Sequence, residues 1–449
     1  MGAWQILSGF GVRMLARVLL LTFVARMYGL SDFGRLGETV ALLELLAAFA
    51  TFGLSKVLLG KLGEEGTLKS PGEHIAEAII LVVALSGVIT TILWAAWPYV
   101  VTDSLAQSQF LILGIPLIAL SEVATTATRH FRTVFWDTLV KALVKPWSFL
   151  LLGVAAFYWV RGISMPSGHI VTSEQALLAA YVCSLLLTAI ASFFAMAKAY
   201  SREQHSLRAR PSISGVFALA RTSLPIALND TGVFAFRRID ILLLAMVAGP
   251  KATGIYYLAQ QIGTIVEKVR YLFEPMLAPI VAQSRSLDTI GTHLSRLVLF
   301  IFSVQLAIIC LFIIFGGSIM DWFGLGFAAG TLVVTIILAG ELMDGSFGLC
   351  ELPMVYRNPI WPPRMVLAAL MLEIFLVWFL AGKYGALGAA IGFAMSMTAL
   401  AIMRVWMVHR LYQFKVIGPR HLMAVAAAIA TCLIASTFMP VLANLGLTQ

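Results

Sequence analysis

Six basic residues lie inside long apolar runs of this chain, where a membrane would exclude them. They are Arg13, Arg17, Arg237, Arg238, Lys268 and Arg270. An arginine at the centre of a bilayer costs roughly 2.5–3.5 kcal/mol on insertion scales, so such side chains face protein or a water-filled interior. The six residues therefore predict a basic strip that lines a polar cavity.

Arg13 and Arg17 are four residues apart, which places both on one face of a helix. Two interpretations are open. They line the cavity, or each pairs with a buried acid such as Glu38 or Glu44 and ties two helices together. Arg13 can also extend toward the membrane surface.

Arg237 and Asp240 are spaced to pair along one helix, whereas Arg238 is turned about 100° away. One of the two arginines is expected to face the cavity, and the spacing does not decide which.

Lys268 and Arg270 lie toward the cytoplasmic end of their run. Arg270 has Glu267 and Glu274 at helical spacing, so these charges either neutralise one another or form a funnel through which an anion enters.

Four acids within the apolar runs are candidates for coupling to an ion, H⁺ or Na⁺. They are Glu44, Asp240, Glu341 and Asp344. The alternative is that each one pairs with a basic residue of a neighbouring helix. The sequence contains no evidence for any other cofactor.

The composition is that of a polytopic membrane protein. The 449 residues are 60% hydrophobic and 12% charged, and the mean hydropathy is +0.93. Soluble domains contain about 25% charged residues. The net charge of +9 is explained by basic cytoplasmic loops, so it does not indicate a nucleic-acid partner.

A membrane span needs about 20 residues, and the apolar runs predict thirteen helices. They cover roughly 4–27, 35–59, 75–99, 110–129, 139–160, 175–198, 224–248, 253–282, 294–317, 328–350, 365–381, 387–409 and 421–442.

The basic residues predict the orientation. Twenty of the 31 lysines and arginines lie in or beside loops that follow even-numbered spans, against five on the other side. Because basic loops stay in the cytoplasm, the N-terminus is expected there too. Lys145 and Arg404 are among the residues that this count assigns to cytoplasmic loops.

The chain repeats itself at an interval of 220 residues. Gly29 matches Gly249, Gly34 matches Gly254, and Arg17 matches Arg237. Six spans per half means that both copies begin in the cytoplasm, so the repeat is parallel, about an axis along the membrane normal. We predict an N-terminal lobe over 1–200, a basic linker over 201–214, a C-terminal lobe over 215–411 and an extra helix over 421–442.

The sequence shows no catalytic signature. It lacks a P-loop, an HExxH motif and a Gly-x-Ser-x-Gly motif, and its seven histidines are scattered. The four cysteines have neither metal-ligand spacing nor a CxxC pair. We predict no catalytic residue and no metal site, and therefore no enzyme.

Several motifs, taken in order, resemble those of a known family. They are Ala25-Arg26-Met27-Tyr28-Gly29-Leu30-Ser31-Asp32-Phe33-Gly34, then Leu224-Pro225, Ile239-Asp240-Ile241 and Gly249-Pro250 through Gly254-x-Tyr256, and finally Tyr384-Gly385-Ala386-Leu387-Gly388-Ala389-Ala390-Ile391. Together they resemble the Wzx-type flippases of lipid-linked oligosaccharides, in the multidrug/oligosaccharidyl-lipid/polysaccharide (MOP) exporter superfamily. The family usually has twelve spans, one fewer than predicted here.

This resemblance implies an all-α fold of two six-helix lobes, V-shaped around a cationic central cavity. It implies export of a polyprenyl-diphosphate-linked oligosaccharide across the bacterial cytoplasmic (inner) membrane by alternating access, for surface polysaccharide synthesis. The implied partners are membrane lipid, the lipid-diphosphate-linked glycan and the polysaccharide polymerase machinery. A cation-coupled multidrug exporter of the same superfamily is the first alternative, and a membrane glycan polymerase or ligase is the second.

Overall fold

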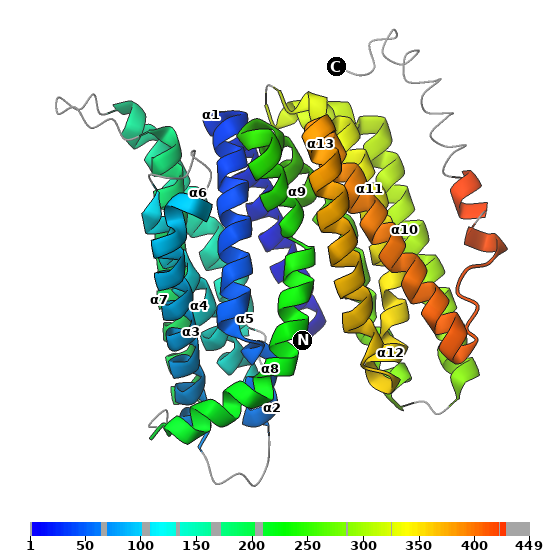
Figure 1. The fold of residues 1–449 in the computed structure, drawn as a ribbon, viewed down its shortest axis with the longest axis horizontal. Helices are drawn as coiled ribbons and strands as arrows, with labels where there is room; N and C mark the ends of the chain where they lie inside the picture. The colour runs from blue at the N-terminus through cyan, green and yellow to red at the C-terminus, as the bar shows by residue number, and fades with distance from the viewer. Residues whose placement is uncertain are drawn as a thin grey trace. The chain divides into compact units, whose positions relative to one another are not determined.

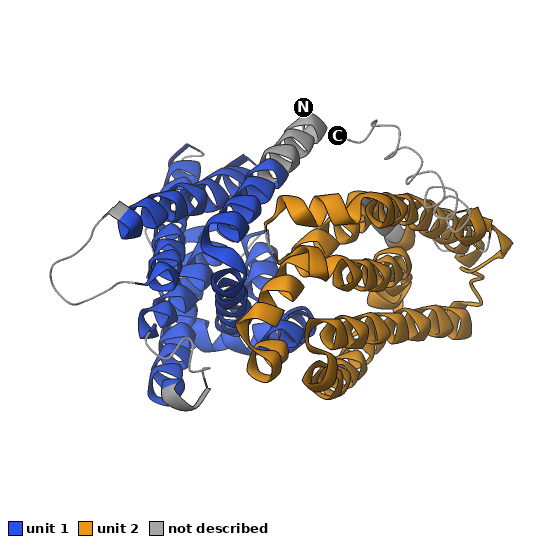
Figure 2. Ribbon diagram, turned by 90° about the horizontal axis from the view of Figure 1, so that it is seen from above, with its two compact units in different colours: residues 1–242 blue, residues 243–449 orange. Residues whose placement is uncertain are grey.

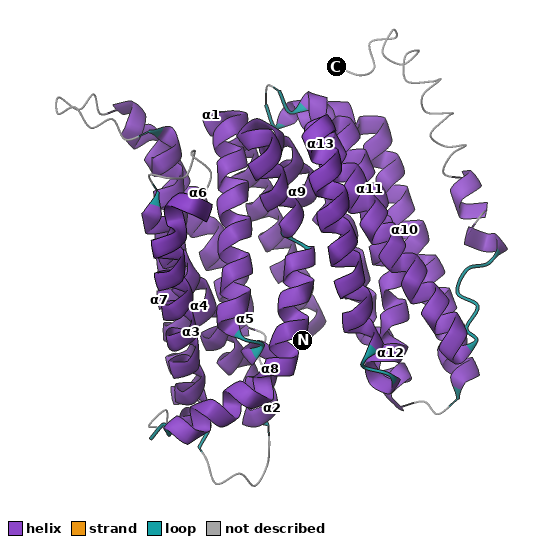
Figure 3. Ribbon diagram, viewed as in Figure 1, coloured by secondary structure: helices purple, strands orange, loops and turns teal. Residues whose placement is uncertain are grey.

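The computed structural model consists of helices and the loops that join them (Figure 3). It describes residues 2–63, 70–100, 108–131, 135–162, 172–202, 210–283, 286–324, 326–421 and 423–427. No strand occurs within these residues. The predicted all-α class is confirmed.

The chain forms two compact units, residues 1–242 and 243–449 (Figure 2). Their boundary lies between Leu242 and Leu243, near the start of a long helix. Residues 203–209 of the predicted linker lie outside the described residues, and the lobe limits inferred from the sequence stay a prediction.

Unit 1 contains eight α-helices and the start of a ninth within its described residues (Figure 1). Their bounds are α1 Gly2–Thr51, α2 Leu54–Leu62, α3 Pro71–Val100, α4 Gly114–Thr128, α5 Phe135–Thr138, α6 Lys145–Gly162, α7 Ser173–Arg202 and α8 Ile213–Phe236. Shorter 3-10 turns cover Gln109–Leu113 and Arg129–Phe131, and a π-helical turn covers Leu139–Val144.

Unit 2 contains most of α9, which runs from Ile239 to Gln283. It continues with α10 Leu287–Trp322, α11 Thr331–Phe347, α12 Glu351–Arg357 and α13 Trp361–Tyr412. The 3-10 turns Ala328–Gly330 and Gly348–Cys350 flank α11.

Three of the long helices are broken at a single glycine. Gly29 in α1 has φ 81° and ψ 177°, and Gly249 in α9 has φ 76° and ψ −178°. Gly385 breaks α13 with φ 57° and ψ −134°. This region of backbone space is essentially restricted to glycine. The same unusual conformation at Gly29 and Gly249 supports the 220-residue repeat at the level of the backbone.

Contacts with other helices fix the break at Gly29. The Tyr28 hydroxyl donates a 2.7 Å hydrogen bond to the carbonyl of Gly153 in α6. Beyond the break, Arg35 pairs with Glu174, and the Ser173 hydroxyl donates to Asp32 at 2.8 Å. The polar residues of the first repeat joint thus anchor the beginning of α7.

Nine helices within the described residues are long and apolar enough to cross a membrane. In α1 and α13 the glycine break leaves two arms that are each long enough for a span of about 20 residues. The protein is therefore an all-α integral membrane protein with several spans. The predicted helix 421–442 lies mostly outside the described residues.

Two predicted spans are interrupted in the structure. The run 35–59 is divided where α1 ends at Thr51 and α2 begins at Leu54. The run 224–248 was expected to be a single helix with Arg237 and Arg238 near its middle, but α8 ends at Phe236 and α9 begins at Ile239. The two arginines form the turn between the helices. Hydropathy detects the apolar run but not this interruption, because only two residues separate the helices and no polar loop lies between them.

Candidate functional site

The joint between α8 and α9 presents Arg238 to the second arm of α1. The Arg238 Nη2 atom lies 2.8 Å from Glu44 Oε2, and its Nε donates to the same oxygen at 3.0 Å. The two side chains are 26% and 22% exposed, so the pair is only partly shielded from its surroundings. Glu44 was a candidate partner of Arg17 in the sequence, and the structure adds a direct contact with Arg238, a residue 194 positions away.

Two more cations act on Glu44. Arg17, in the first arm of α1, and Lys145, at the start of α6, both interact electrostatically with its carboxylate. Both are half-buried. Within unit 1, three cations from α1, α6 and the α8–α9 joint therefore act on one carboxylate. We call Arg17, Lys145, Arg238 and Glu44 the unit 1 cluster.

Lys145 was missed as a site residue. It was counted among the cytoplasmic loop residues, although it lies within the predicted span 139–160. A π-helical turn, Leu139–Val144, directly precedes it, and such turns are frequent at functional sites. Its place inside an apolar run was the signal that could have found it.

Arg237 and Asp240 lie on either side of the beginning of α9. The carbonyl of Arg237 accepts a 3.1 Å hydrogen bond from Nη1 of Arg238. Asp240 is fully buried, and its carboxylate accepts the N–H of Ile241 at 2.8 Å. An acid in the first turn of a helix is favoured by the helix dipole. Roles of Arg237 in binding and of Asp240 in ion coupling stay predictions.

Arg13 lies in α1, but its side chain is outside the described residues. Its assignment to the cavity stays a prediction.

Unit 2 contains a second charged cluster, centred on Asp344 of α11. One oxygen of Asp344 lies 2.5 Å from Nη1 of Arg404, and the other lies 3.3 Å from Nη1 of Arg270. Arg404 also contacts Glu351 at 2.6 Å. The side chains of Asp344 and Arg404 are only 3% and 6% exposed. We call these four residues the unit 2 cluster.

The structure gives Arg404 partners that the sequence does not predict. Counted as an edge of a cytoplasmic loop within the predicted span 387–409, Arg404 is buried in the second arm of α13 and bound to two acids. An arginine near the end of an apolar run can face protein or solvent, and only the neighbouring helices decide which.

The contacts of Arg270 in the structure differ in part from those that helical spacing predicts. Its Nη2 donates to the Tyr271 hydroxyl at 3.1 Å, and that hydroxyl donates to Glu267 at 3.2 Å. Lys268 lies 3.8 Å from Glu267 and 4.8 Å from the centre of the Tyr271 ring. The carboxylate bound directly to Arg270 is Asp344 of another helix.

Glu341 lies one helical turn before Asp344 in α11 and is 1% exposed. The structure thus places both acids inside unit 2, as their spacing predicts. Their use in ion coupling stays a prediction.

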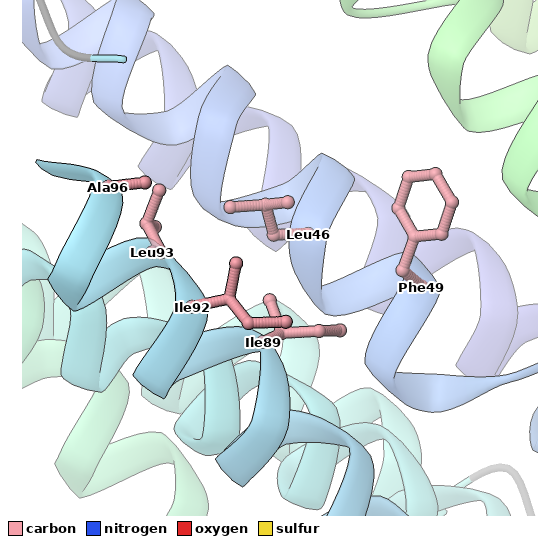
Figure 4. A pocket seen from close by; sticks show the side chains of 6 residues that line it. All are labelled: Leu46, Phe49, Ile89, Ile92, Leu93 and Ala96. Carbon is pink, nitrogen blue, oxygen red and sulfur yellow. The ribbon is translucent and has the colours of Figure 1, made fainter. Parts of the chain in front are cut away.

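An open apolar cavity of about 340 Å³ lies between the second arm of α1 and α3 (Figure 4). It is lined by Leu46, Phe49, Ile89, Ile92, Leu93 and Ala96. Leu46 and Phe49 face roughly the opposite side of α1 from Glu44, given about 100° per residue. The cavity therefore does not belong to the unit 1 cluster.

Comparisons with known proteins identify the fold. No family model and no curated protein sequence matches the chain. Solved structures do, and among them is an inward-facing multidrug resistance MATE family transporter of the MOP superfamily, with a TM-score of 0.67 and 13% identity over 89% of this chain and 94% of that one. An outward-facing MATE transporter has a TM-score of 0.54 at 14% identity, over 90% and 93%. The fold is that of MOP transporters.

The lipid II flippase MurJ, in an inward closed conformation, is also similar. Its TM-score is 0.71 at 12% identity, and the alignment covers 98% of this chain and 99% of that one. The sequence motifs led us to expect the fold of the MOP superfamily, and the similarity to these structures confirms that fold. The solved structures named here are transporters rather than enzymes.

Proposed function

We propose that this protein is a flippase that exports a polyprenyl-diphosphate-linked oligosaccharide across the bacterial inner membrane for surface polysaccharide synthesis. The observation that carries the proposal is the unit 1 cluster, in which Arg17, Lys145 and Arg238 all act on the carboxylate of Glu44. The similarity to a lipid II flippase over nearly the whole chain supports it.

The chemistry of the cluster suits a diphosphate. The head group of such a lipid is an anion that must cross a medium of low dielectric constant, where an uncompensated charge is very costly. Arginine supplies paired N–H donors in a geometry that matches phosphate oxygens, and lysine supplies a compact charge. Arg17, Lys145 and Arg238 together bring both kinds of donor to the neighbourhood of Glu44, where an anionic head group would find them.

The same charge argues against export of a cationic drug, which is the alternative that the MATE structures raise. A cationic substrate is stabilised by acids in its binding site, whereas the unit 1 cluster has more cations than acids.

The test is flipping in liposomes that contain the purified full-length protein. A fluorescent polyprenyl-diphosphate oligosaccharide is placed in both leaflets, and a membrane-impermeant quencher reports how much reaches the outer one. We expect the double variant Arg17→Gln, Arg238→Gln to lose most of the activity while inserting normally. Arg202→Gln, an exposed arginine at the end of α7, is the matched control and should flip at the wild-type rate.

Wild-type activity in the double variant would refute the role of the cluster. Transport of a cationic dye by the wild type, with no flipping of the lipid, would favour the multidrug exporter.

A further inference from the structure

The backbone of the α8–α9 joint is tied to the unit 1 cluster through one side chain. The guanidinium of Arg238 donates through Nη1 to the carbonyl of Arg237, and through Nε to Glu44. Arg237 is the residue that terminates α8. A single side chain therefore caps the end of one helix and holds it against another.

This joint also stands close to the boundary between the two units. The chain leaves unit 1 after Leu242, and the backbone N–H of Leu242 bonds to the carbonyl of Arg238 at 3.4 Å. The remaining backbone bonds of the joint are short-range turns, from the N–H of Arg237 to Phe234 and from that of Arg238 to Ala235. Interrupted helices of this kind are where a chain absorbs a change of backbone angle.

We propose that Glu44 is a built-in counter-ion that occupies Arg238 in place of the substrate, and that the diphosphate displaces it. This inference rests on the proposed function, and it makes Arg238 the residue that links binding of the diphosphate to the α8–α9 joint. A carboxylate and a phosphate group present similar pairs of acceptor oxygens to a guanidinium. The pair is partly exposed, with 22% of Glu44 and 26% of Arg238 accessible, so an anion can reach it.

The exchange has a consequence for the backbone. When Arg238 turns toward a bound diphosphate, its planar guanidinium moves as one rigid group, so the bonds from Nε to Glu44 and from Nη1 to the Arg237 carbonyl are displaced together. The end of α8 is then released from α1. Once the substrate departs, Arg238 pairs with Glu44 again, and the hydrogen bonds of the joint re-form.

The experiment separates this exchange from a purely structural ion pair. Binding of farnesyl diphosphate to the detergent-solubilised protein is measured for the wild type, Glu44→Gln, Glu44→Asp and Arg238→Gln, with farnesol as the uncharged control probe. Removing the competing carboxylate should tighten farnesyl diphosphate binding on the order of tenfold, the equivalent of one hydrogen bond to a charged group. Glu44→Asp should restore most of the competition.

Flipping by Glu44→Gln should nevertheless be slower than in the wild type, because nothing displaces the anion from Arg238 at the end of the cycle. Tighter binding with slower turnover is a combination that simple loss of a helix contact does not produce. Glu122→Gln is the matched control. Glu122 is paired with Lys141 at 2.9 Å and is 33% exposed, but it lies outside the cluster, so its loss should leave the affinity for farnesyl diphosphate unchanged.

Hydrogen exchange at the amides of Arg237, Arg238 and Leu242 tests the joint without any substrate. We expect faster exchange in Glu44→Gln than in the wild type. Equal exchange rates would overturn the link between Glu44 and the joint.

The two proposals fail in different ways. Wild-type and Arg238→Gln proteins that bind farnesyl diphosphate equally would overturn the proposed phosphate site, and the exchange with it. Weaker binding by Arg238→Gln, together with unchanged or weaker binding by Glu44→Gln, would overturn the counter-ion role alone.

Discussion

Replacing Arg404 by methionine should destabilise unit 2 severely. Arg404 bridges Asp344 of α11 and Glu351 of α12, at 2.5 and 2.6 Å, and its side chain is 6% exposed. Methionine fills a similar volume but removes the charge and every N–H donor. Asp344, which is 3% exposed, then retains Arg270 at 3.3 Å as its remaining cation among the ion pairs described above.

The size of the expected destabilisation follows from the burial of the Arg404–Asp344 ion pair. Removing one partner of a buried ion pair costs about 3–5 kcal/mol, because the other charge is left without compensation. For a unit the size of residues 243–449, each kcal/mol lowers the melting temperature by roughly 2–4 °C. We therefore expect a decrease on the order of 10 °C.

Two buried thiols make the assay specific for this unit. Cys310 and Cys350 are buried and belong to unit 2. Cys183 is exposed, so it is replaced by serine together with Cys432, which lies outside the described residues. A thiol-reactive dye then reports thermal unfolding of unit 2 in the detergent-solubilised protein.

Arg410→Met is the matched control. Arg410 lies on the same helix, is exposed, and stacks 5.2 Å from the centre of the Trp406 ring. Exposed contacts of this type contribute about 0.5–1 kcal/mol, so the shift should be small. If the two variants melted at the same temperature, the ion pairs of Arg404 would not support unit 2.

Two glycines give further predictions. Gly348→Ala should lower the melting temperature of unit 2 in the same thiol assay, since a Cβ there would overlap the guanidinium of Arg270 and push it away from Asp344. Gly317→Ala, where the added Cβ meets open space, should have no such effect, and equal shifts would contradict the packing argument. Gly29→Ala should destabilise unit 1 by about 1–3 kcal/mol, because the φ of 81° with extended ψ suits glycine alone. Tryptophan fluorescence during thermal unfolding measures this loss, and Gly153→Ala, which also has open space, is the comparison that should melt as the wild type does.

The repeat joints could be predicted from the sequence in some detail. Gly29 and Gly249 were matched by their 220-residue interval alone, and the structure gives them nearly the same backbone angles. The reason is local. A glycine-specific break in a helix is encoded by the residue that occupies it, so the sequence carries the information directly.

The partners of the buried charges could not be predicted in the same way. Helical spacing suggested that Arg237 pairs with Asp240 and that Arg270 pairs with Glu267 or Glu274. The structure binds Arg270 to Asp344, 74 residues away. Spacing identifies which side chains share a face of one helix, but it holds no information about the helix that this face meets.

The sequence by itself determined that this is an all-helical membrane protein with repeated glycine joints and charges inside its apolar runs, because hydropathy and glycine conformation act over short stretches of chain. Only the tertiary structure decided that Arg238 meets Glu44, and that Arg404 is buried against Asp344. Both contacts depend on which helices pack together. Helix packing in turn depends on the shape and charge of whole helix faces, to which residues far apart in the chain contribute.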